Sequence, residues 1–112
     1  MDRKKALREY KEAPRPAGVY RVQHTPSGRT LLGASPDAPA MLNRIRFQLQ
    51  SRGHPNRQLQ ADWIADGADA FLFEVVDLLP PLESEEKDPA EELALLEEMW
   101  REKLKLEESA RY

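Results

Sequence analysis

The chain has no cysteine and only two histidines, His24 and His54, among its 112 residues. The absence of cysteine excludes disulfide bonds and thiolate metal sites. No apolar run approaches the roughly 20 residues that a membrane span requires, and the first residues lack the apolar stretch of a signal peptide. We therefore expect a cytoplasmic protein without membrane contact, with one domain and a small core built from its 40% apolar residues.

Positive and negative charges are divided unevenly along the chain, although the net charge is only −3. Residues 1–57 hold 12 lysines and arginines and 4 acids, a balance of +8, whereas residues 58–112 hold 5 and 16, a balance of −11. A basic first half predicts a surface that faces a polyanion. Two charged faces that pair with each other within the fold would give the same counts, so both interpretations stay open.

Local signals predict an α+β domain with a small three-stranded sheet, antiparallel or mixed, flanked by helices. A helix over residues 2–12 precedes Pro14 and Pro16. We assign residues 1–17 to this N-terminal helix and its linker, and residues 18–108 to the domain. The strands are expected at 19–24, 29–34 and 70–76, and the turn at 25–28 has proline and glycine at positions typical of a hairpin turn.

Two helices are predicted in the middle of the chain from their caps and their apolar periodicity. Ser35 is placed to cap the first, with Pro36 at its first helical position and Gly53 at its end. Asn56 is placed to cap the second, which closes at Gly67. An acidic loop over about 80–88 then leads to a last helix from a cap at Asp88 to about Glu107.

Glu97 interrupts the apolar stripe of this last predicted helix. It lies four residues after Leu93 and three before Trp100, so the three side chains share one side of the helix. A buried carboxylate needs an ion pair, a proton or a bound cation, because an unpaired buried charge is very costly. At the edge of the stripe the same side chain would reach water or an arginine, and this alternative remains open.

Several segments of the chain, in order, resemble the GIY-YIG nuclease family. The tripeptide Gly18–Tyr20 is similar to the first of the family's two tripeptides, and Gly33 matches the last residue of the second. Further similar segments are Leu42–Arg44, Leu59–Trp63, Gly67–Phe71, Phe73–Val75 and Leu96–Glu97, and His54–Gln60 also resembles a phrase of small bacterial members. The resemblance extends from about residue 18 to residue 104 and implies the family's fold.

The resemblance also implies a set of site residues. In the family, a tyrosine near the attacking water, an arginine on the phosphate and a divalent cation on a glutamate are thought to act together. It therefore implies Tyr20, His54 and Glu97 as catalytic candidates, with Glu97 as the ligand of Mg²⁺ or Mn²⁺ if the protein is active. The position of the catalytic arginine, counted from Gly33, holds Met41 in this chain.

At the positions where the chain departs from the family pattern, its residues are apolar. Besides Met41, Ile45 stands in place of a histidine and Leu31 in place of the second tripeptide's tyrosine. Loss of a transition-state arginine costs about 10³–10⁵ in rate. We therefore predict a catalytically degenerate domain that binds DNA or RNA through its basic half, with these nucleic-acid-binding residues: Arg44, Arg52, Asn56 and Arg57.

Two alternative functions remain. The first is an active nuclease that depends on a divalent metal, with Tyr20 or His54 at the water, Glu97 on the cation and Arg44 on the phosphate. The second is a protein-interaction module, in which the acidic last helix meets a protein partner or a second copy of the chain. No cofactor is expected unless the domain is active.

Overall fold

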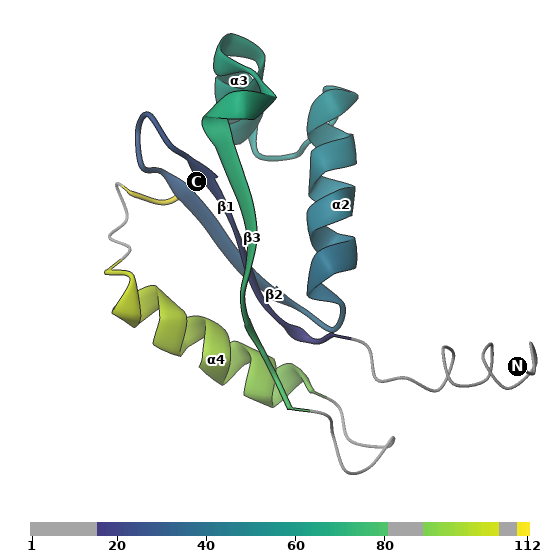
Figure 1. The fold of residues 1–112 in the computed structure, drawn as a ribbon, viewed down its shortest axis with the longest axis vertical. Helices are drawn as coiled ribbons and strands as arrows, with labels where there is room; N and C mark the ends of the chain where they lie inside the picture. The colour runs from purple at the N-terminus through teal and green to yellow at the C-terminus, as the bar shows by residue number, and fades with distance from the viewer. Residues whose placement is uncertain (1–15, 81–88, 106–109) are drawn as a thin grey trace, which may run out of the picture.

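The structure is a computed structural model that describes residues 16–80, 89–105 and 110–112, and its described part is an α+β fold (Figure 1). The helix predicted over residues 2–12, most of the acidic loop and the cap at Asp88 lie outside the described residues. None of the helices in the described part is long and apolar enough to cross a membrane.

Three antiparallel strands form the sheet, in the order β2-β1-β3. The strands are β1 (Gly18–His24), β2 (Thr30–Ser35) and β3 (Phe71–Leu78). The predicted hairpin is confirmed, since the backbone N–H of His24 donates to the carbonyl of Arg29 across the turn at 2.9 Å. The central strand β1 begins with the first tripeptide, Gly18–Tyr20. The pairing of β1 with β2 places Tyr20 directly opposite Gly33.

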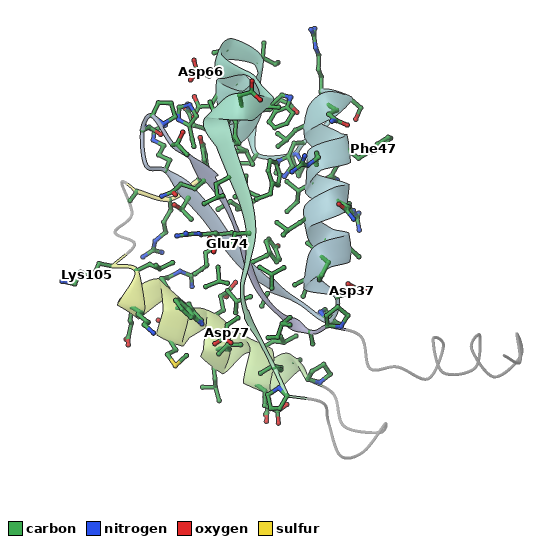
Figure 2. All side chains as sticks on the ribbon, in the orientation of Figure 1. Asp37, Phe47, Asp66, Glu74, Asp77 and Lys105 are labelled. Carbon is green, nitrogen blue, oxygen red and sulfur yellow. The ribbon has the colours of Figure 1, made fainter. Side chains whose placement is uncertain are left out.

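The longer helices cover both faces of this sheet. Helix α2 (Ala38–Gln50) packs on the face that carries Val22, and α3 (Arg57–Asp66) lies beside the C-terminal end of α2 (Figure 1). Helix α4 (Ala90–Lys103) covers the opposite face, where Asp77 of β3 lies beside it (Figure 2). The indole N–H of Trp100 donates to Asp77 at 3.0 Å. The helices on the two faces contact different residues of each strand, because successive side chains of a strand point to opposite sides of the sheet.

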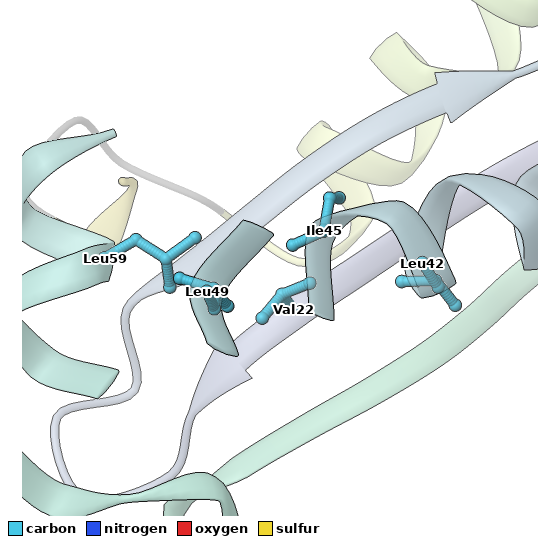
Figure 3. Close-up of a cluster of buried hydrophobic side chains, with 5 residues drawn as sticks. All are labelled: Val22, Leu42, Ile45, Leu49 and Leu59. Atoms are coloured by element: carbon cyan, nitrogen blue, oxygen red, sulfur yellow. The ribbon is translucent and has the colours of Figure 1, made fainter. Parts of the chain in front are cut away.

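A cluster of five buried aliphatic residues joins α2 and α3 to the sheet (Figure 3). Burial of each such side chain contributes about 1.5–3 kcal/mol. Met41 and Leu31 are partly buried and pack against this cluster, so two of the apolar departures belong to the packing of the domain. The third departure, Ile45, is a member of the cluster itself; the members are Val22, Leu42, Ile45, Leu49 and Leu59.

Helix α2 begins later than the sequence predicted. Its N-cap is Asp37, whose side chain accepts a hydrogen bond from the backbone N–H of Ala40 at 3.2 Å. Ser35 ends β2, and its hydroxyl accepts from the N–H of Asp37 at 3.1 Å. The cap predicted at Ser35 was therefore wrong, because two residues with capping side chains stand two positions apart and the second one is used.

The end of the last helix and the burial of β3 also differ from the prediction. Helix α4 ends at Lys103 rather than near Glu107, and Lys105 adopts a left-handed conformation with φ of 52°. Strand β3 is a half-buried edge strand rather than a mostly buried one. The folded contacts also continue past residue 108, since the N–H of Tyr112 donates to the carbonyl of Thr30 at 3.2 Å.

Candidate functional site

Tyr20 lies across the glycine that ends the second tripeptide. A Cβ atom at Gly33 would meet the hydroxyl oxygen of Tyr20 and would lie only 2.6 Å from its Cζ atom. The phenol ring therefore fills the space above Gly33, on the edge strand β2. The two tripeptides therefore form one structural unit, because the ring of Tyr20 fits only where residue 33 has no side chain.

Glu97 of α4 influences Tyr20 of β1 electrostatically. Burial, and to a smaller extent the negative charge of Glu97, raise the pKa of Tyr20 above its ordinary value. Both effects favour the protonated phenol, which is the form that can donate a hydrogen bond. Among the three residues predicted to be catalytic, this electrostatic influence is the interaction found in the described part of the chain.

The nearest guanidinium to Glu97 comes from α4 itself and was missed by the sequence analysis. Arg101 places its Nη1 atom 3.8 Å from Glu97 and 3.7 Å from Glu98, and about a quarter of its side chain is exposed. Its Nε atom is buried and has no hydrogen-bond partner in the described part of the chain. The spacing of four residues after Glu97 could have revealed this pairing, because i and i+4 side chains are neighbours on a helix.

The donor set around Glu97 does not fit a resident metal ion. Among residues 16–80, 89–105 and 110–112, no group of three or more acidic or histidine side chains gathers to hold an ion. The carboxylate of Glu97 already faces the guanidinium of Arg101. A divalent cation there would displace a cation that the protein supplies itself, so we derive no chemical step through Mg²⁺ or Mn²⁺.

His54 lies in the connection between α2 and α3, where it has a local structural role. Its Nδ1 atom accepts a hydrogen bond from the N–H of Asn56 at 3.0 Å, and its own N–H donates to the side chain of Gln60 at 3.0 Å. Burial lowers its pKa, although the hydrogen bond with Asn56 opposes this effect. All of these contacts are within the α2–α3 connection, and none reaches Tyr20 or Glu97.

Asn56 is the N-cap of α3, as predicted. Its side chain accepts a hydrogen bond from the N–H of Leu59 at 3.1 Å. Gln60 is buried and donates to the carbonyl of Leu49 at 3.0 Å, which fixes the start of α3 against the end of α2. The side-chain oxygen of Asn56 is thus committed to the cap.

The three arginines predicted to bind nucleic acid are all exposed and lie on α2, its C-terminal end and α3. Arg44 is on the outward side of α2, Arg52 follows the helix, and Arg57 is the first residue of α3. We call these residues, with the exposed Phe47, the α2–α3 surface. Arg44 is not turned toward the position of Met41 in the core, so it makes no contact with Tyr20 or Glu97 in the described residues.

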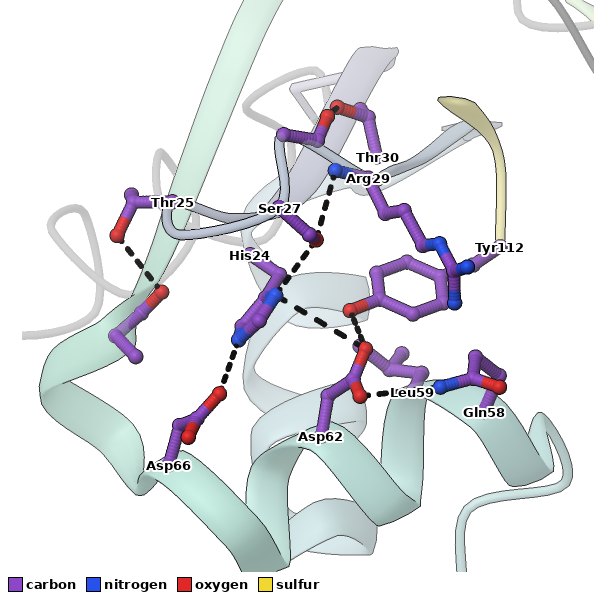
Figure 4. Close-up of polar contacts among 12 residues, drawn as sticks. His24, Thr25, Ser27, Arg29, Thr30, Gln58, Leu59, Asp62, Asp66 and Tyr112 are labelled. Carbon is purple, nitrogen blue, oxygen red and sulfur yellow. Dashed lines mark hydrogen bonds and ion pairs between the residues drawn. The ribbon is translucent and has the colours of Figure 1, made fainter. Parts of the chain in front are cut away.

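A buried polar network fixes the hairpin turn to α3, and only the fold reveals it (Figure 4). His24 is buried, with Nε2 2.6 Å from Asp66 and Nδ1 2.7 Å from the hydroxyl of Ser27. The hydroxyl of Tyr112 donates to Asp62 at 2.5 Å, and burial followed by this hydrogen bond raises its pKa. His24 and Asp66 are 42 residues apart, and Tyr112 and Asp62 are 50 residues apart, so no local sequence pattern indicates these two contacts.

The antiparallel β2-β1-β3 sheet with helices on both faces, and the Tyr20–Gly33 unit that joins β1 to β2, define a GIY-YIG-like fold. No protein-family model and no curated protein matches the chain. Two solved structures share its fold. The catalytic domain of homing endonuclease I-TevI has a TM-score of 0.66 and 18% identity, over 86% of this chain and 95% of that domain. A mutant of the catalytic domain of intron endonuclease I-TevI has a TM-score of 0.66 and 16% identity, over 87% of this chain and 91% of that domain. The fold predicted from the sequence is therefore confirmed.

Proposed function

We propose that this chain is a nucleic-acid-binding domain that has kept a GIY-YIG-like fold without efficient phosphodiester hydrolysis. The observation that carries the proposal is the composition of the α2–α3 surface. Its three arginines lie within residues 38–61, a stretch that contains no aspartate or glutamate. A cluster of exposed arginines without carboxylates is the electrostatic footprint of a phosphate-binding surface.

The packing around Met41 supports the loss of catalysis. Efficient phosphoryl transfer needs a positive charge on the oxygens of the transition state, and loss of such an arginine costs about 10³–10⁵ in rate. Met41 packs against the apolar core with Leu31, and Ile45 is 4% exposed. A polar cleft of the kind that the family resemblance implies is thus replaced by apolar contacts on this side of Tyr20. The similar domain in I-TevI comes from an endonuclease, which favours nucleic acid over other polyanions as the ligand.

The first prediction concerns the salt dependence of binding. Three phosphate contacts, by Arg44, Arg52 and Arg57, predict a slope of log K against log salt of about −2 for a single strand. The affinity should therefore fall about 20-fold between ~50 mM and ~200 mM salt. Fluorescence anisotropy with labelled DNA and RNA oligonucleotides measures both quantities. A flat salt response, or no binding at ~50 mM salt, would overturn the proposal.

A second candidate function is phosphodiester hydrolysis, favoured by the electrostatic interaction of Glu97 with Tyr20. Our proposal predicts no cleavage of labelled DNA or RNA above background in Mg²⁺ or Mn²⁺. The decisive comparison is Glu97→Ala with Glu98→Ala, because Glu98 is the adjacent, more exposed carboxylate that also faces Arg101. Cleavage that is lost in the first variant and kept in the second would establish the nuclease function. Cleavage that survives in both would indicate a contaminating enzyme.

A further inference from the structure

A small open pocket lies between the C-terminal end of α2 and α3. It has a volume of about 240 Å³ and is lined by Leu49, Gln50, Arg52, Trp63 and Ile64. This volume is below the roughly 300–1,000 Å³ of pockets for drug-sized ligands, so it suits a fragment such as one planar ring system. The lining residues comprise two aliphatic residues, a tryptophan, a glutamine and an arginine, which are residue types that can supply apolar contact, stacking, hydrogen bonds and charge.

Arg52 is held at this pocket in a backbone conformation that arginine rarely adopts. Its φ is 61°, in the left-handed region that favours glycine. The N–H of Arg52 donates to the carbonyl of Leu49 at 3.2 Å, and the N–H of Gly53 donates to that of Gln48 at 2.8 Å. These bonds form the Schellman motif, in which glycine is the usual residue at the position of Arg52. The chain has a glycine at the next position instead, so an arginine side chain occupies the strained one.

None of the residues that line the pocket together with Arg52 is acidic. The nearest acids in the sequence are Asp37 and Asp62, and no ion pair joins Arg52 to a carboxylate in the described residues. Phe47, one turn before the end of α2, is 69% exposed and lies on the side of the helix away from the sheet (Figure 2). The pocket itself is lined by a basic and an aromatic residue, Arg52 and Trp63, the combination on which single-stranded nucleic acids bind.

We propose that this pocket receives one unpaired nucleobase of a single strand, with the guanidinium of Arg52 on the adjacent phosphate. This inference rests on the proposed nucleic-acid-binding function and specifies the substrate as single-stranded. The base stacks against the wall formed by Trp63 and Ile64, and the amide of Gln50 is placed to bond its polar edge. A base in an intact duplex cannot enter, because both of its faces are stacked on neighbouring bases.

The test compares two substitutions, each of which replaces a cationic residue of positive φ with glycine, at different places in the fold. Arg52→Gly removes the guanidinium and relieves the left-handed conformation, so the variant is expected to fold at least as well as the natural chain. Lys105→Gly is the matched control, because Lys105 is also a cation with a positive φ, of 52°, at the end of α4. We expect Arg52→Gly to weaken binding of an oligothymidylate about fivefold at ~100 mM salt, and to reduce the salt slope by about 0.7. Lys105→Gly should change neither quantity.

A spectroscopic readout tests the base-binding part of the proposal in the full chain. In protein labelled with 5-fluorotryptophan, the ¹⁹F resonance of Trp63 should shift with the oligothymidylate and stay in place with a duplex. The resonance of Trp100, assigned with Trp100→Phe, should move with neither. Thymidine monophosphate as a competitor distinguishes a strand site from a mononucleotide site, since the monomer should bind far more weakly.

The outcomes separate this inference from the proposed function. If the natural chain binds no nucleic acid, both are overturned. If it binds with a steep salt dependence but Arg52→Gly and Lys105→Gly behave alike, or the Trp63 resonance does not shift, only the pocket is overturned. If thymidine monophosphate binds as tightly as the oligonucleotide, the pocket is a mononucleotide site and the single-strand assignment is wrong.

Discussion

Replacing Arg44 and Arg57 together with glutamate is expected to weaken the binding of a single-stranded oligonucleotide about 30-fold or more at ~100 mM salt. Each phosphate contact on a single strand contributes a salt slope of about −0.7, which corresponds to about fivefold in affinity at that salt concentration. Loss of two contacts therefore gives about 25-fold, and the two new carboxylates add repulsion. Both residues are exposed, so the substitutions leave the core intact. Anisotropy titrations at several salt concentrations measure the effect.

The matched control for this prediction is the double substitution Lys103→Glu and Lys105→Glu. It changes the net charge by the same amount, but on α4, which covers the opposite face of the sheet. We expect the control to reduce affinity only slightly, because charges more than a Debye length of about 10 Å from the bound strand are screened at that salt concentration. Equal losses in the two double variants would show that overall charge governs binding, and would remove the role of the α2–α3 surface.

Gly18→Ala is expected to lower the free energy of unfolding by about 3 kcal/mol, at the upper end of what overpacking costs. A Cβ atom at Gly18 would meet the carbonyl oxygen of Asp77 and lie 3.0 Å from the Cα atom of Leu78. Both are backbone atoms of β3, next to the irregularity where the register between β1 and β3 shifts. The backbone cannot rotate away as a side chain can, so the strands must separate. For a domain of this size the melting temperature should fall by about 15 °C.

Gly53→Ala is the control for this effect. The nearest atom to a Cβ at Gly53 is the hydroxyl oxygen of Ser51 at 3.8 Å, an ordinary contact. This variant should be neutral or slightly more stable, because alanine reduces the freedom of the unfolded chain. Circular dichroism melts of the two variants and the natural chain provide the comparison. An unchanged melting temperature for Gly18→Ala would mean that β1 and β3 are not as close at this point as the structure has them.

The sequence was most informative where structure depends on neighbouring residues. The hairpin at residues 25–28, the cap at Asn56 and the end of α3 at Gly67 all follow from local backbone chemistry, and all are confirmed. The start of α2 was misplaced because both Ser35 and Asp37 can cap a helix. The end of α4 was misplaced because Lys105 takes a left-handed conformation without glycine to signal it.

The parts of the site that depend on distant residues were harder to predict. The apolar stripe of the last helix allowed two explanations for Glu97. Its ion pair with Arg101 could have been predicted from the spacing of four residues, whereas its electrostatic influence on Tyr20 depends on the fold. His54 was grouped with them through the family resemblance, but its contacts are with Asn56 and Gln60. Spacing along a helix reveals helical neighbours, whereas contacts between strands and helices depend on how the chain folds back on itself.

The ring of Tyr20 above Gly33 has a consequence for recognising distant relatives of this domain. An aromatic side chain at position 20 requires glycine at position 33, so the two positions should coevolve even where the surrounding sequence diverges. A homology search that scores this coupled pair, at its fixed cross-strand register, should detect relatives that a profile of independent columns overlooks.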